Sequence, residues 1–187
     1  MKNLLVGIFL LLAPIMNGQA VHYRIETGKP QQIMEHFSSS DAWSTQFVGL
    51  WPQEKQNQMA DWLFSMETDS KGQPKGIGLP LWRFYVGAGS TEQGEEGSVW
   101  TRAECFLQAD GTYNWDKMKG QRNFIKLAKE RGVNKFLAFL NSPPVNFTQN
   151  GLATNTGRDG TFNMKSDCYV KYAAYLADII EGVEKHD

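Results

Sequence analysis

The chain has 187 residues, of which 41% are hydrophobic and 21% are charged, and its formal net charge is −1. This composition is typical of a globular protein. A net charge so close to zero gives no electrostatic basis for binding nucleic acid or an anionic membrane surface, so we expect neither as a partner.

The N-terminus predicts a secretory signal peptide over residues 1–20. Lys2 supplies a short positive region, and residues 4–16 form an apolar stretch that is too short to span a bilayer comfortably. The sequence G-Q-A, which ends at Ala20, places small residues at the two positions that signal peptidase reads. We therefore expect cleavage after Ala20, a secreted, periplasmic or cell-surface location, and a mature domain over residues 21–187 with no membrane contact. The alternative is an uncleaved membrane anchor.

The first strand-and-helix unit begins with residues 33–37, which predict a short strand. A serine-rich loop with Asp41 and Trp43 follows. Pro52 suits the first turn of a helix, where its missing N–H costs nothing. Apolar residues then recur at helical spacing and predict the buried face of that helix: Met59, Trp62, Leu63 and Met66.

The second unit begins with a strand over residues 79–86, whose nearly continuous apolar run is typical of a strand covered on both faces. Arg83 interrupts the run. The loop over residues 87–111 is long enough to indicate a function. It opens with G-A-G-S-T-E, residues 87–92, which resembles half of a dinucleotide-binding motif. We exclude that reading because a glutamate replaces the third glycine and no helix is expected there.

The third unit follows a turn at residues 110–112. Asn114 or Asp116 can cap its helix, which Gly132 ends, and its periodic face holds Phe124, Leu127, Ala128 and Arg131. Residues 136–140 predict the third strand, which Pro143 and Pro144 end. Ser166 or Asp167 can cap a last helix, with an apolar stripe of Tyr169, Ala173, Leu176 and Ile180.

This alternation of strands and helices predicts an α/β fold with a parallel sheet and right-handed crossovers. A complete (β/α)₈ barrel takes about 250 residues. The chain is therefore either the N-terminal portion of such a TIM barrel, with about three βα units, or a small open sheet.

Candidate binding residues lie in and just after the predicted strands, where enzymes of this class place their sites. Asp41 can accept hydrogen bonds from sugar hydroxyls while Trp43 covers a pyranose, or it can cap a turn while Trp43 packs inside. Asn141 either offers a ligand both a donor and an acceptor or belongs to the turn before the prolines. Arg83 either orients a carboxylate in a site or forms a structural ion pair. Trp100, on the long loop, is the best placed of the remaining tryptophans to stack on a sugar.

The two cysteines, Cys105 and Cys168, do not form a C-x-x-C pair and have no histidine cluster near them. Metal-ligand spacing is therefore missing, and we expect no metal or other cofactor. Export permits a disulfide between them, but two free buried thiols fit the sequence equally well. His36 lies on an apolar run and is interpreted as structural.

Five motifs occur in order along the chain: S-D-A-W at 40–43, L-W-R-F-Y-V-G-A-G-S at 81–90, R-A-E-C-F-L at 102–107, D-G-T-Y-N-W at 110–115 and A-F-L-N-S-P-P at 138–144. Together they resemble the N-terminal half of the endo-β-1,6-galactanase-like branch of glycoside hydrolase family 30. The resemblance runs from about residue 21 to the last residue.

The resemblance implies a (β/α)₈ barrel with a side β-sandwich, retaining hydrolysis without a metal, and a polysaccharide or oligosaccharide partner with β-linked galactose. It also implies two catalytic glutamates, at the ends of strands 4 and 7, whose carboxyl groups lie about 5–5.5 Å apart. No glutamate here has a motif that matches either role, and the chain ends before strand 4 would begin, so we expect no catalytic residue in it. The roles that carry over are sugar binding by Asp41, near Trp43, and by Asn141.

The chain departs from the family pattern at three places. The chain has H-F-S-S-S-D at 36–41 where the family usually has G-F-G-A-S-D, so His36 and Ser38 replace both glycines. Tyr85-Val86 replaces an N-I pair, and Asn146 replaces a tryptophan that could stack on a sugar. We expect a hydrolase that is inactive as this polypeptide alone. The alternative is a saccharide-binding protein without catalysis. An open half barrel would also expose strand edges and apolar helix faces, so we expect self-association.

Overall fold

The computed structural model describes residues 21–93, 98–154 and 162–187, and it divides into two units, Met1–Met34 and Glu35–Asp187. The described part of the first unit is exposed and holds no helix or strand. Its one turn is closed by a hydrogen bond from the Lys29 N–H to the Glu26 carbonyl, at 3.1 Å. The predicted signal peptide lies outside the described residues. Among the described residues, every helix and strand belongs to the second unit.

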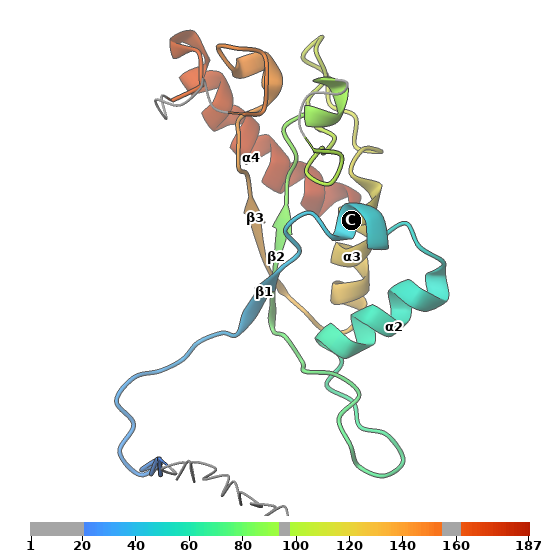
Figure 1. Cartoon of the computed structure of the whole chain (residues 1–187), viewed down its shortest axis with the longest axis vertical. Coiled ribbons are helices and arrows are strands. Elements are labelled where there is room, and N and C mark those ends of the chain that lie inside the picture. The colour runs from blue at the N-terminus through green and yellow to red at the C-terminus, as the bar shows by residue number, and fades with distance from the viewer. Residues whose placement is uncertain (1–20, 94–97, 155–161) are drawn as a thin grey trace, which may run out of the picture. The chain divides into compact units, whose positions relative to one another are not determined.

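A parallel sheet of three strands, in chain order, lies at the centre of the second unit (Figure 1). Its strands are β1 (Ser38–Ser40), β2 (Leu81–Tyr85) and β3 (Lys135–Phe139). The register places Ser40 opposite Arg83, and Arg83 opposite Leu137. The second and third predicted strands are confirmed. The strand predicted over residues 33–37 is wrong, because pairing with β2 begins only at Ser38.

The helices are α1 (Thr45–Val48), α2 (Gln53–Phe64), α3 (Lys119–Glu130) and α4 (Tyr169–His186), with short 3₁₀ turns at Ser90–Gln93, Val145–Phe147 and Ser166–Cys168. Pro52 at the start of α2 and Gly132 after α3, which has a φ of 87°, confirm two predicted helix boundaries. No helix of the described residues is long and apolar enough to cross a membrane. The 3₁₀ turn at Ser90 is a short helix where none was expected.

The predicted side-chain caps of the last two long helices are wrong. Met118 precedes α3 and Cys168 precedes α4, and neither side chain caps its helix. The Asn114 side chain instead accepts a hydrogen bond from the Asp116 N–H at 3.0 Å, which closes a local turn. Asn and Asp side chains make such turns as readily as caps, so the sequence did not separate the two.

The core lies between the sheet and the helices. Alternate residues of a strand point to the same face, and Trp82, Phe84 and Val86 meet buried residues of three helices: Phe64 of α2, Phe124 of α3 and Ile179 of α4. The rings of Phe64 and Trp82 pack edge to face with centroids 5.1 Å apart. This arrangement leaves Leu81, Arg83 and Tyr85 on the other face of β2.

The predicted face of α3 is confirmed. That of α2 is confirmed only at Met59 and Leu63, which are partly buried against the core, and that of α4 is wrong. In α2 the buried stripe is Gln56, Ala60 and Phe64, and the side chains of Trp62 and Met66 are 56% and 81% exposed. In α4 the buried residues are Tyr175, Ile179, Gly182 and Val183, while Tyr169 and Ile180 are more than half exposed. Both helices carry apolar residues on two sides, so periodicity alone did not decide which side faces the sheet.

Cys105 and Cys168 are both buried, and they do not form a disulfide with each other. The Sγ atom of Cys105 lies 3.6 Å from the hydroxyl of Tyr175, within hydrogen-bond reach for sulfur. Of the two alternatives that the sequence left open, the structure therefore has two buried thiols.

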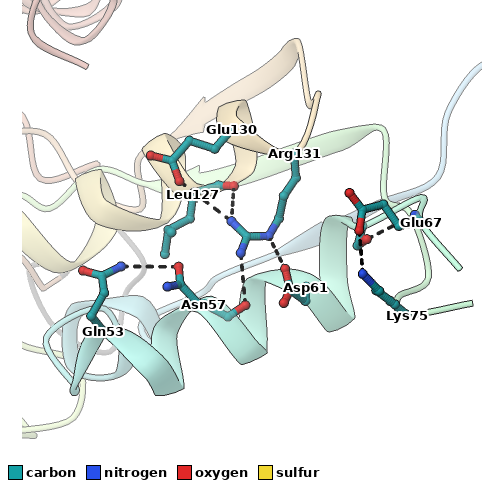
Figure 2. A network of polar contacts seen from close by, with 9 residues as sticks. Gln53, Asn57, Asp61, Glu67, Lys75, Leu127, Glu130 and Arg131 are labelled. Carbon is teal, nitrogen blue, oxygen red and sulfur yellow. Dashed lines mark hydrogen bonds and ion pairs between the residues drawn. The ribbon is translucent and has the colours of Figure 1, made fainter. Parts of the chain in front are cut away.

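Arg131, just after α3, joins that helix to α2 (Figure 2). Its guanidinium donates to the Asp61 carboxylate at 2.7 Å, to the Asn57 carbonyl at 3.2 Å and to the Leu127 carbonyl at 3.0 Å. The Arg131 side chain is only 15% exposed, so water screens these contacts little. The bridge fixes α2 against α3 on the helix side of the sheet.

Replacing Arg131 with methionine should lower the free energy of unfolding by about 1–3 kcal/mol, because two backbone carbonyls and one carboxylate lose their donor. Urea denaturation of both proteins measures the change. The control is Lys75→Met, which removes an exposed ion pair with Glu67 and should have a much smaller effect. Equal effects of the two variants would contradict this role of Arg131.

The outer stripe of α4 leads us to expect that the isolated chain self-associates. Val170 is 82% exposed and Ile180 is 57% exposed, and Phe162, 63% exposed, stacks on Tyr169 beside them. The double variant Val170→Ser, Ile180→Ser should shift the protein toward monomer in light scattering. A wild-type chain that stays monomeric at every concentration would contradict the expectation.

Candidate functional site

Asp41 joins three elements at the carboxyl ends of the strands. It follows β1 directly and is 3% exposed. Its Oδ1 atom accepts a hydrogen bond from the Tyr85 N–H at 2.9 Å, and its Oδ2 atom accepts one from the Thr45 hydroxyl at 2.6 Å. Its own N–H donates to the Arg83 carbonyl at 3.1 Å. The residue therefore ties the end of β1 to β2 and to the start of α1.

Burial raises the pKa of Asp41 to about 7. The hydrogen bonds from Thr45 and Tyr85 and the positive charge of Arg83 oppose this rise, but the loss of hydration outweighs them. Near neutral pH the carboxyl is therefore present in both its protonated and its ionised form.

The turn after Asp41 has unusual backbone geometry. Ala42 has a φ of 46°, a conformation that residues with a side chain rarely adopt. The Ser44 N–H donates to the Asp41 carbonyl at 2.8 Å and closes the turn. The turn role that the sequence allowed for Asp41 is thus present. Its contact with a sugar remains a prediction.

Trp43 lies over the end of β2. Its ring meets that of Tyr85 edge to face, with centroids 5.9 Å apart. Trp43 is half-buried, and its indole nitrogen has no hydrogen-bond partner among the described residues. Burial raises the pKa of the Tyr85 hydroxyl, and the nearby Trp43 side chain opposes part of that rise. Two aromatic rings therefore lie at the strand ends, and of these Trp43 is partly exposed to solvent.

Arg83 packs against an aromatic ring, in an arrangement that the sequence did not predict. Its guanidinium carbon lies 3.6 Å from the centroid of the Phe139 ring, a cation–π contact across β2 and β3. No carboxylate of the described residues forms an ion pair with it. We call Asp41, Trp43, Arg83 and Tyr85 the strand-end cluster.

Asn141 and Trp100 lie outside this cluster. Asn141 is exposed, two residues beyond β3, and makes no hydrogen bond to Asp41 or Arg83. Trp100 stacks on Phe47 of α1, with centroids 4.8 Å apart and ring planes within 12°. The Gln46 side chain donates to the Trp100 carbonyl at 2.7 Å, so the long loop lies over α1. Trp100 stays 52% exposed and can still meet a ligand.

Sequence reasoning missed two residues of the site, Thr45 and Tyr85. Thr45 stands four residues after Asp41, the spacing at which side chains meet on a helix. Tyr85 stands two residues after Arg83 and so shares its face of the strand. Its contact with Asp41, however, uses the backbone N–H. Every residue except proline has this group, so the residue type could not predict the contact.

The chemistry of the cluster is that of binding and positioning. It offers one carboxyl group, one fixed cation and two aromatic rings. In the described ranges, no three residues among His, Cys, Asp and Glu converge in a way that could hold a metal ion.

Comparison with known proteins decides the family. The sequence model of the O-glycosyl hydrolase family 30 matches residues 20–187. The chain belongs to this family. No curated protein matches it.

Two solved structures resemble this family 30 chain. A conserved exported protein from Bacteroides fragilis is 40% identical and superposes with a TM-score of 0.80 over 86% of the chain. The catalytic domain of the GH30 xylanase C from Talaromyces cellulolyticus, 24% identical, matches over 81% with a TM-score of 0.50, which shows a shared fold. The chain spans 33% of the length of each.

The buried carboxyl of Asp41 predicts a pH-dependent stability. Its pKa rises from 3.8, the value expected in the unfolded chain, to about 7 in the fold, so between these values only the folded state holds the proton. Stability relative to Asp41→Asn should therefore fall by about 1–4 kcal/mol as the pH rises from 4 to 8. The asparagine variant is the neutral control, since its amide oxygen can still accept from the Tyr85 N–H while its NH₂ group donates to the Thr45 hydroxyl oxygen. Urea midpoints that change in parallel for both proteins would contradict the shift.

Proposed function

We propose that this chain forms part of the saccharide-binding wall of an exported family 30 glycoside hydrolase, acting on polysaccharides with β-linked galactose. The observation that carries the proposal is the strand-end cluster. It brings Asp41, Trp43 and Arg83 together at the carboxyl ends of two parallel strands, where α/β enzymes bind their substrates.

The sheet represents, in this proposal, the first three strands of a (β/α)₈ barrel. Support comes from the parallel order of β1, β2 and β3 and from the match of 86% of this chain to 33% of a longer chain. Helices cover one face of the sheet, as on the outside of such a barrel. The face that carries Arg83 and Tyr85 would then point to the barrel interior.

The sugar would meet the partly exposed ring of Trp43, which can cover the apolar face of a pyranose. Asn141 can donate to one hydroxyl and accept from another. Asp41 has both oxygens engaged and almost no exposed surface, so it acts mainly by fixing the loop that carries Trp43. Arg83 would support the site through its charge.

The catalytic glutamates would lie outside this polypeptide. Retaining hydrolysis needs two carboxyl groups about 5–5.5 Å apart, and the strand-end cluster contributes only one carboxyl group. We therefore propose that this polypeptide binds a saccharide but does not hydrolyse it alone. A second candidate function is saccharide binding without catalysis, even as part of a larger protein. It is favoured because the one carboxyl group of the cluster, that of Asp41, already has both oxygens in hydrogen bonds within the fold.

Export agrees with two observations. The structural relative from Bacteroides fragilis is described as an exported protein. The N-terminal sequence has the pattern of a cleaved signal peptide.

Calorimetric titration with β-1,6-galactotetraose tests the proposal, and β-1,4-xylotetraose is a second probe because one relative is a xylanase. Trp43→Ala should weaken galactotetraose binding at least about tenfold, or about 1.4 kcal/mol, since the stacking surface is lost. Trp51→Ala is the control, because Trp51 is a more accessible tryptophan, 50% exposed, outside the cluster.

Equal binding by the Trp43 and Trp51 variants would contradict the proposed site. Binding of xylotetraose alone would move the specificity from galactan to xylan. Release of reducing sugar from β-1,6-galactan by the purified chain would show that the chain is catalytic by itself.

A further inference from the structure

A surface hollow lies on α2, on the side of the helix that faces away from the core. Its volume is about 550 Å³, and its lining consists of Glu54, Asn57, Gln58, Asp61, Trp62, Asp69, Pro74 and Lys75. We call it the α2–hairpin pocket. The hairpin precedes β2 and so lies toward the amino ends of the strands, while the strand-end cluster lies at their carboxyl ends (Figure 1). The two sites share no residue.

The floor of this pocket is one stripe of α2. Glu54, Gln58 and Trp62 follow each other at intervals of four residues and therefore lie in a row. Trp62 is 56% exposed, although Phe64, two residues later, is fully buried in the core. Trp62 is therefore a large exposed indole on a polar helix face, inside a hollow, where its ring is available to stack on a ligand.

The opposite wall is a short hairpin whose shape is fixed before any ligand arrives. Thr68 and Pro74 form an antiparallel bridge, and the Asp69 side chain accepts hydrogen bonds from two backbone N–H groups of the turn, each at 2.8 Å. The Ile77 N–H donates to the Trp62 carbonyl at 2.9 Å and holds the hairpin on α2.

Gly76 allows this hairpin to lie close to the backbone of α2. A Cβ atom there would lie 2.0 Å from the Asp61 carbonyl, so no other residue fits without a backbone shift. A wall held this way costs little entropy when it binds a ligand.

The polar groups of the pocket favour a neutral, hydroxyl-rich ligand. Carboxylates of Glu54 and Asp69 can accept hydrogen bonds, and the amides of Asn57 and Gln58 can both accept and donate. The cation of the pocket, Lys75, is paired with Glu67 at 2.7 Å (Figure 2). The remaining negative charge repels phosphates, sulfates and uronic acids.

We propose that the α2–hairpin pocket binds a neutral oligosaccharide, with one pyranose ring stacked on Trp62 and hydroxyl groups bonded to Glu54 and Gln58. This site goes beyond the proposed function, because it lies at the other end of the sheet and requires no cleavage. It would hold a distant part of a polysaccharide whose reacting end lies elsewhere.

Nuclear magnetic resonance can follow both sites in one titration. The chain has six tryptophans, and each indole N–H gives its own cross-peak in a ¹⁵N-labelled sample. Trp62→Phe and Trp43→Phe assign the two peaks of interest by their loss. β-1,6-Galactotetraose and β-1,4-xylotetraose are the probes, and we expect at least one of them to shift the Trp62 peak saturably.

Matched variants then test the contact itself. Trp62→Ala should weaken binding at this site at least tenfold, followed through the backbone peaks of Gln58, whereas Trp62→Phe should retain most of it. Trp51→Ala should leave the Trp62 shift unchanged. A Trp62 peak that stays fixed with both sugars, or Gln58 shifts that persist in Trp62→Ala, would overturn the proposal.

The same spectra separate this inference from the proposed function. A shift of the Trp43 peak alone supports the strand-end site and overturns the pocket, and a shift of the Trp62 peak alone does the reverse.

Because the pocket is acidic, cations are the alternative ligand class to be tested. Shifts of Trp62 with trilysine that vanish at high salt, together with no shift from either sugar, would show a site for cations and overturn the saccharide.

Discussion

The buried carboxyl of Asp41 is the interaction on which the arrangement of the strand ends depends. β1 has only three residues, so its ladder to β2 is short. The hydrogen bonds that the Asp41 carboxyl accepts from the Tyr85 N–H and the Thr45 hydroxyl extend that attachment beyond the strand and fix the start of α1. The loop that carries Trp43 begins at this point. Without the carboxyl, the turn at Ala42 would keep its backbone hydrogen bond but lose its side-chain attachment to β2 and α1.

One face of β2 packs in the core, and the other face carries residues of the candidate site. Trp82, Phe84 and Val86 are buried against the helices and supply the apolar area that stabilises the fold. Arg83 and Tyr85 alternate with them and so lie on the opposite face, beside Phe139. One five-residue strand thus anchors the core and presents the candidate site. Any change that slipped its register by one residue would exchange the two faces.

The sequence predicted those parts of the fold that have one dominant signal. The second and third strands are apolar runs, and Gly132 ends α3 in the left-handed conformation that glycine favours. β1 was displaced in the prediction because its three serines carry no hydrophobic pattern. Trp62 and Ile180 were placed in buried faces because their helices have two apolar sides, and only packing against Trp82 and Tyr113 selects one. The places of Asp41, Trp43 and Arg83 in or after the strands followed from the predicted strands. The contact of Tyr85 with Asp41 did not, because it uses the backbone N–H.

A crystal structure of the chain soaked with β-1,6-galactotetraose tests whether the strand-end cluster holds a saccharide. We expect a pyranose ring stacked on Trp43, with Asn141 within hydrogen-bond distance of its hydroxyl groups. A well-occupied sugar bound elsewhere, with the strand ends empty, would contradict it.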